Sequence, residues 1–224
     1  ENITINNKSF RLLIPSYLGP GAPNNSSSQN TIELPTNIAD AKKPIIGVSA
    51  SFNKDTGELY SLMFLQDKNK THNPRKYKFT PLVSDTSGST PVGFGRIDKK
   101  GEAVEINCRP NSAINKVEVF HNGNVIKSIR LYAADINTGN PVKILDPVTS
   151  KMRKYATVGI NVSRSDPTII SEIAECSGFV FDGKYYPVFF SQVGAYQGTD
   201  DGITKIYSLG FLKCAVYQSG FTIS

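Results

Sequence analysis

The chain is built from short apolar or alternating runs that are separated by turn-forming Gly, Asn, Asp and Pro residues. Ile45–Phe52 and Leu59–Leu65 flank one such turn. Further hairpins are predicted at Asn122–Gly123 and Asp182–Gly183, and we expect a type I′ turn at Asn122–Gly123 because both residues tolerate positive φ. This pattern predicts an all-β fold of antiparallel hairpins, arranged as a sandwich, barrel or prism.

One segment carries a helical pattern instead. In Pro167–Ala174, apolar residues recur at helical spacing and Pro167 fits the first turn of a helix. Ser165 or Asp166 is suited to cap its start. We therefore expect at most one short helix, near residues 167–174.

The N-terminal part differs from the rest in composition. Residues 1–42 hold a strand candidate, Asn2–Phe10, and then small polar and turn-forming residues from Gly19 to Asn30. Such a stretch cannot bury enough apolar surface to order itself, so we expect a flexible loop. Residues 43–224 are predicted to form an all-β core domain, with a possible subdivision at the polar stretch near 84–91.

The charge of the chain is moderately positive. Its 224 residues include 25 Lys and Arg against 19 Asp and Glu, a formal charge of +6, which favours anionic partners without requiring one. The densest basic stretch contains Arg75, Lys76 and Lys78 and is either a solvated loop or an anion-binding site. We expect no nucleic-acid partner, because such proteins interleave clustered basic residues with stacking aromatics. No transmembrane span is expected, because no run approaches the ~20 apolar residues required.

Three cysteines allow at most one disulfide within the chain. Cys176 and Cys214 lie in strand-like runs and are predicted to face each other across neighbouring strands. Their bridge would close a loop of about 40 residues and contribute roughly 3–4 kcal/mol. Cys108 competes for either partner, and three buried thiols in a reducing compartment are the alternative.

Few residues are suited to catalysis or metal binding. Neither His72 nor His121 belongs to a nucleophile motif, and His121 begins a predicted turn, where we expect an exposed imidazole. We expect no cofactor and no metal, since the chain has no Cys-x-x-Cys pair and no His near a Cys. Asp200 and Asp201 are the most suggestive carboxylates, as ligand-binding groups or as ordinary turn residues.

Tyrosine offers a more specific signal. Half of the ten tyrosines lie in the last part of the chain, from Tyr185 onward. A tyrosine ring presents an apolar face to the C–H side of a sugar and a hydroxyl to its polar rim. Tyr185, Tyr186 and Tyr196, with Asp200 and Asp201, are therefore the predicted ligand-binding residues; the alternative is that these rings fill the core.

Two segments carry a resemblance to a known family. Ile45–Phe52 with Leu59–Phe64, and Val117–Tyr132, each read as a hairpin whose last strand has the pattern aliphatic-x-Ser-aliphatic and ends in an aromatic residue. They resemble strand pairs of β-prism domains of the jacalin and vitelline-outer-layer kinds. The resemblance implies a β-prism fold and glycan binding. It implies no binding residues, because the Gly-rich N-terminus and the Gly-x-x-x-Asp sugar loop of jacalins have no clear counterpart.

Together these features predict a secreted or surface-exposed, non-catalytic recognition protein that binds carbohydrate through turns and Tyr side chains. Its expected partner is a glycan or a cell-surface protein. One alternative is a protein-binding adhesin, coat or secreted effector module that uses strand edges or the basic loop around Arg75. Another is a glycoside hydrolase that depends on paired carboxylates.

Overall fold

The computed structural model describes residues 2–5, 8–11, 17–20, 30–32, 44–65, 93–95, 101–200, 203–216 and 222–223. These residues form strands and turns, which confirms the predicted all-β fold. The described part holds no helix, and so no helix long and apolar enough to cross a membrane.

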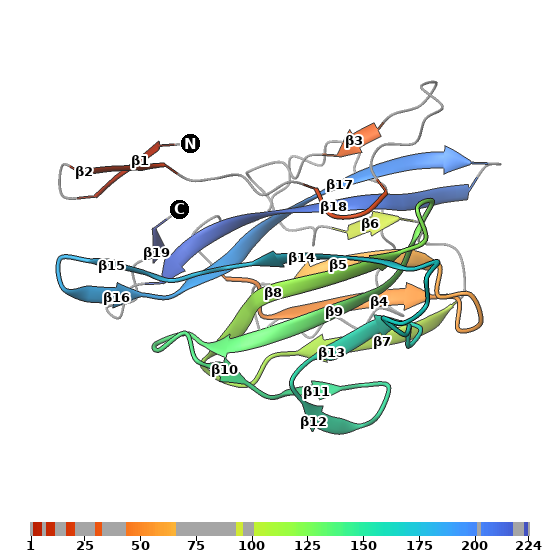
Figure 1. Ribbon diagram of the computed structural model, residues 1–224, viewed down its shortest axis with the longest axis horizontal. Helices are drawn as coiled ribbons and strands as arrows, with labels where there is room; N and C mark the ends of the chain where they lie inside the picture. Colours follow the sequence, from red (N-terminus) through yellow and green to blue (C-terminus); the bar gives the residue numbers. More distant parts are fainter. Residues whose placement is uncertain are drawn as a thin grey trace.

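Figure 1 shows the strands along the chain. In chain order they are β1 (Asn2–Ile5), β2 (Lys8–Arg11), β3 (Asn30–Ile32), β4 (Gly47–Phe52), β5 (Leu59–Leu65), β6 (Gly93–Gly95), β7 (Glu102–Asn107), β8 (Ser112–His121), β9 (Ile126–Asp135), β10 (Pro141–Val142), β11 (Ile144–Asp146), β12 (Lys151–Arg153), β13 (Ala156–Gly159), β14 (Ile170–Glu175), β15 (Phe179–Phe181), β16 (Lys184–Tyr186), β17 (Val188–Asp200), β18 (Ile203–Val216) and β19 (Thr222–Ile223).

Most of the strands belong to three antiparallel sheets. One has the order β6-β5-β4-β7, and a second has the order β10-β9-β8-β14 with β13 also paired to β9. The third has the order β19-β18-β17-β3, so that a strand from the N-terminal region lies against the long C-terminal hairpin. Leu18 joins the same hairpin, because its backbone N–H and C=O both bond to Leu209 at 2.8 Å.

The three sheets enclose one core, because alternate residues of their strands point inward. Leu62 of β5, Val119 of β8 and Leu209 of β18 are fully buried in the same cluster. The rings of Phe190 and Phe211 lie 4.8 Å apart between centroids, a contact worth about 0.5–1.5 kcal/mol beyond the area it buries. Of the sandwich, barrel and prism that the sequence left open, three sheets around one core correspond to the prism.

The short helix allowed at 167–174 is not formed. Asp166 Oδ1 accepts hydrogen bonds from the backbone N–H and the hydroxyl of Thr168, which makes a local turn rather than a helix cap. Ile170–Glu175 then pair with β8 as strand β14. Ile170 and Ile173, which suggested an apolar helix face, are exposed.

The predicted hairpin at Asn122–Gly123 is confirmed, but its turn is not type I′. Of the two residues only Gly123 has a positive φ. Asn122 Oδ1 accepts hydrogen bonds from the N–H groups of Asn124 and Val125, and this cap organises the turn without a left-handed Asn. A type I′ geometry lies at Asp182–Gly183, where φ is 51° and 70° and two residues join β15 to β16.

The N-terminal strand candidate also differs from expectation. Within residues 2–11 the chain forms two paired strands, β1 and β2, rather than one. Residues 66–92 lie outside the described part, so the predicted subdivision near 84–91 stays a prediction.

Candidate functional site

The hairpin of β15 and β16 has an inner and an outer face. Strand alternation places Phe179, Phe181 and Tyr186 on one face, where the rings of Phe179 and Tyr186 stack with centroids 5.3 Å apart. Val180 and Tyr185 form a cross-strand pair on the other face and are exposed. The stacked aromatics therefore hold the hairpin in place and leave the Tyr185 ring at the surface.

Two glycines pack closely against the Tyr185 ring. A Cβ atom added at Gly139 would lie 2.9 Å from the Tyr185 hydroxyl, and one at Gly178 would lie 2.7 Å from Cε2 of the ring. Gly139 belongs to the turn between β9 and β10, whereas Gly178 immediately precedes β15. Backbone from two separate segments thus flanks the hydroxyl end of the ring, Gly139 on the Cε1 side and Gly178 on the Cε2 side, and any other residue at Gly178 would displace the ring.

The turn beside the ring, Asp135–Asn140, is rigid and polar. Asp135 Oδ1 accepts hydrogen bonds from the backbone N–H groups of Asn137 and Thr138, both at 2.9 Å, and these bonds lower the pKa of Asp135. The side chains of Asn137, Thr138 and Asn140 are exposed. We call the Tyr185 ring together with this turn the Tyr185 platform.

Two of the other predicted ligand-binding residues, Tyr186 and Tyr196, do not add an exposed ring to this platform. Tyr186 is buried and supports the hairpin from inside. Tyr196 lies on β17 beside Tyr17, with ring centroids 4.4 Å apart. Asp200 ends β17, and its side chain and all of Asp201 lie outside the described part.

The other predicted sites receive no support. Arg75, Lys76 and Lys78 lie outside the described residues, so the anion-binding site stays a prediction. Cys176 is a buried thiol rather than half of a disulfide, and Cys108 is a buried thiol as well. Cys214 lies opposite Phe189 in the β17–β18 ladder, whereas Cys176 follows β14, which pairs with β8, so the predicted Cys176–Cys214 bridge across neighbouring strands receives no support.

The expectation of an exposed His121 is wrong. Its side chain is only 5% exposed, Nδ1 accepts a hydrogen bond from Gly123, and Nε2 lies 3.2 Å from Glu172 Oε2. Glu172 also accepts a hydrogen bond from the backbone N–H of Gly19. His121 therefore packs at the end of β8 beside the N-terminal segment. Among the described residues, no group of three His, Cys, Asp or Glu side chains is placed to hold a metal ion.

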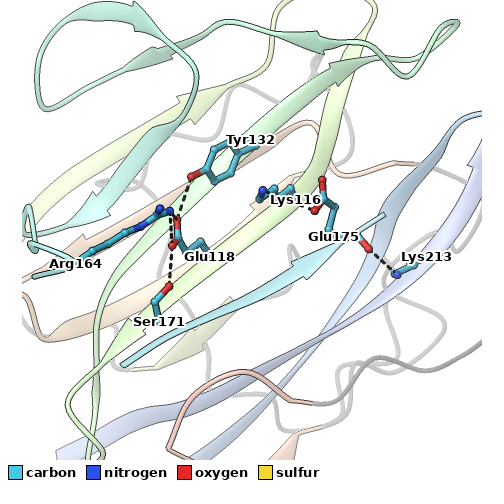
Figure 2. Close-up of polar contacts among 7 residues, drawn as sticks. All are labelled: Lys116, Glu118, Tyr132, Arg164, Ser171, Glu175 and Lys213. Carbon is cyan, nitrogen blue, oxygen red and sulfur yellow. Dashed lines mark hydrogen bonds and ion pairs between the residues drawn. The ribbon is translucent and has the colours of Figure 1, made fainter. Parts of the chain in front are cut away.

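A second polar site, which the sequence did not indicate, lies on β8. Figure 2 shows Glu118 pointing toward Arg164, Tyr132 and Ser171. Arg164 Nη2 donates to both carboxylate oxygens at 2.6 and 2.8 Å, the Tyr132 hydroxyl donates at 3.0 Å and the Ser171 hydroxyl at 2.7 Å. The Glu118 side chain is 1% exposed. We call these four residues the Glu118 cluster.

The electrostatics of the Glu118 cluster favour an ionised carboxylate. Burial raises the pKa of Glu118, but hydrogen bonds from Arg164, Ser171 and Tyr132 and the charge of Arg164 together hold it below its ordinary value. Burial, together with the hydrogen bond to Glu118 and its negative charge, raises the pKa of Tyr132 to about 12. A carboxylate engaged in this way is suited to holding the loop that carries Arg164 against the sheet, not to transferring protons.

Comparisons with known proteins return only distant likenesses in structure. No protein-family model and no curated protein matches the sequence. Calsepa lectin in complex with a biantennary N-glycan has a TM-score of 0.47 at 13% identity, over 91% of this chain and 96% of that chain. A prostate-specific WGA16 glycoprotein lectin has a TM-score of 0.45 at 13% identity, over 87% of this chain and 96% of that chain. A single-chain recombinant jacalin has a TM-score of 0.42 at 14% identity, over 91% of this chain and 95% of that chain.

These matches agree with the weak resemblance to jacalin-type β-prism domains that the two hairpins suggested. At such identities and TM-scores they carry no inference about the ligand or the function of this chain.

Proposed function

We propose that this protein binds a glycan at the Tyr185 platform. The observation that carries the proposal is a tyrosine ring, 47% exposed, that is held against two glycines beside a rigid turn with exposed amide and hydroxyl groups. The ring offers an apolar face to the C–H groups of a sugar, and Asn137, Thr138 and Asn140 offer donors and acceptors to its hydroxyls.

The rigidity of the platform supports this role. Stacked rings fix the hairpin, and hydrogen bonds to Asp135 fix the turn, so few groups have to be ordered when a ligand binds. In this proposal the protein acts at the cell surface or outside the cell, where glycans are displayed, and acts without catalysis.

The test is a glycan array probed with the folded wild-type protein, followed by titration calorimetry on its best glycan. Tyr185→Ala should weaken binding by at least about tenfold, because the stacking surface is removed. Leu145→Ala is the matched control, since Leu145 is an apolar residue of similar exposure, 51%, on another hairpin. The absence of any bound glycan, or equal affinities for wild type and Tyr185→Ala, would overturn the proposal.

A further inference from the structure

The hairpin of β11 and β12 exposes aliphatic side chains to solvent. Leu145 and Met152 form a cross-strand pair on one face, and Val148 lies in the turn that joins the strands. Their exposed fractions are 51%, 42% and 53%. In Figure 1 this hairpin lies at the lower edge of the molecule, away from β17 and β18.

The hairpin is held rigidly by one buried carboxylate. Asp146 Oδ1 accepts a hydrogen bond from the backbone N–H of Thr157 at 3.0 Å, and Oδ2 accepts one from the Thr149 hydroxyl at 2.9 Å and one from Arg153 at 3.3 Å. Ser150 closes the turn with a φ of 53°. The aliphatic side chains are therefore displayed by a fixed backbone rather than by a flexible loop.

Positive charge surrounds these aliphatic side chains. Residues 143–154 contain four basic side chains and one acidic side chain, a net charge of 4 − 1 = +3. The acidic side chain is Asp146, which is buried and paired with Arg153. Lys143, Lys151 and Lys154 are exposed, and Lys143 and Lys154 flank the Leu145–Met152 pair along the two strands.

We infer that this hairpin docks on the surface of a lipid bilayer that carries anionic headgroups. Leu145, Val148 and Met152 enter the boundary between headgroups and acyl chains, while the flanking lysines remain at the level of the phosphates. Each lysine gains from the negative potential of the bilayer surface, and the fixed backbone requires no ordering on contact.

A bilayer fits the hairpin better than a protein does. Three side chains offer far less than the roughly 800 Å² that each partner of a stable protein interface buries. A symmetric contact between two copies of this hairpin would bring the lysines of both copies together, and like charges repel. The inference is independent of glycan binding, because Tyr185 lies on a different hairpin.

The test uses the absence of tryptophan from the chain. Val148→Trp introduces the chain's single tryptophan at the tip of the hairpin, and Val180→Trp introduces one on the β15–β16 hairpin as a control. With vesicles of phosphatidylcholine and phosphatidylserine, we expect a blue shift of emission for Val148→Trp alone. With phosphatidylcholine vesicles we expect none for either variant. Equal shifts for the two variants, or no shift for Val148→Trp, would contradict the inference.

Charge variants measure the second half of the inference without a fluorophore. Lys143→Gln with Lys154→Gln should weaken sedimentation with phosphatidylserine vesicles roughly 25-fold, at about fivefold for each lysine. Lys54→Glu changes the net charge by the same amount at the exposed turn between β4 and β5, outside the hairpin that contacts the bilayer, and should leave binding within about twofold. Equal losses of binding for the two charge variants would assign the binding to overall charge and overturn the inference. Concentration-dependent dimers that Leu145→Asp abolishes would assign the hairpin to a second copy of the chain and would overturn it as well.

Discussion

The Glu118 cluster and the Tyr185 platform both bring together polar groups from distant segments, but only the cluster is complete. Both oxygens of Glu118 are used by side chains of the protein itself, and the carboxylate is closed off from solvent. At the platform, the ring of Tyr185 and the side chains of Asn137 and Asn140 face outward. We conclude that the cluster stabilises the fold, whereas the platform is open to a ligand.

The largest expected effect is on stability. Glu118→Ala should lower the free energy of unfolding by about 3 kcal/mol, because Tyr132 and Ser171 lose a charged acceptor and a buried cavity is left. Urea denaturation measures the change. Glu175→Ala is the matched control, since Glu175 is 57% exposed and lies 3.7 Å from Lys116; it should cost less than about 1 kcal/mol. Similar costs for the two variants would mean that the cluster has no special role.

The next effect is on the platform alone. Gly178→Ala should weaken glycan binding about tenfold, or about 1.4 kcal/mol, because the new methyl group collides with the Tyr185 ring and turns it away from its seat. Gly178 does not have a positive φ, so the backbone should tolerate alanine and the thermal midpoint should change little. Ser177→Ala, one residue earlier, should leave the affinity unchanged. A Gly178→Ala variant that binds as tightly as wild type would argue against a fixed ring.

A smaller effect on stability is expected when the Tyr132 hydroxyl alone is removed from the Glu118 cluster. Tyr132→Phe removes one of the donors to Glu118 and should cost about 1 kcal/mol of stability, with glycan binding unchanged. In the wild-type protein, the absorbance of tyrosinate should include a component titrating near pH 12 from Tyr132, which Tyr132→Phe removes. A titration in Tyr132→Phe identical to that of wild type would place the shifted pKa elsewhere.

The smallest effect is the pH dependence that Glu118 contributes. Its pKa is lower in the folded chain than in the unfolded chain, so its stabilisation is present above the unfolded pKa and is lost as pH falls through the folded one. Asp135 and Asp166 also have lowered pKa values and contribute to the pH dependence of stability. The contribution of Glu118 is therefore measured as the difference between the wild-type curve and the Glu118→Gln curve. Thermal midpoints from neutral pH into acid should fall more steeply for wild type than for Glu118→Gln. Parallel curves would contradict the lowered pKa.

The sequence predicted the hairpins well, because each depends on residues that are close along the chain. Asp182–Gly183 specifies its own turn, and strand alternation places Tyr185 and Tyr186 on opposite faces. Which of the two faces is buried depends on the packing of Phe179 against Tyr186. Secondary-structure propensities do not predict such packing.

The parts that were missed depend on long-range contacts. Glu118 meets Arg164 and Ser171 across 46 and 53 positions, and no local motif marks those partners. Nothing in the sequence marks Gly139 and Gly178 as neighbours, although both make room for the same ring. The prediction of a short helix at 167–174 was wrong for a related reason, because pairing with β8 outweighed a weak local helical pattern.

The pairing of Leu18 with Leu209, and of β3 with β17, also sets an order for folding. Leu18 and β3 cannot take up these positions until β17 and β18 have left the ribosome, and closing so large a loop is slow. A product truncated before Val188 would carry Leu18 and β3 without the hairpin to which they bond.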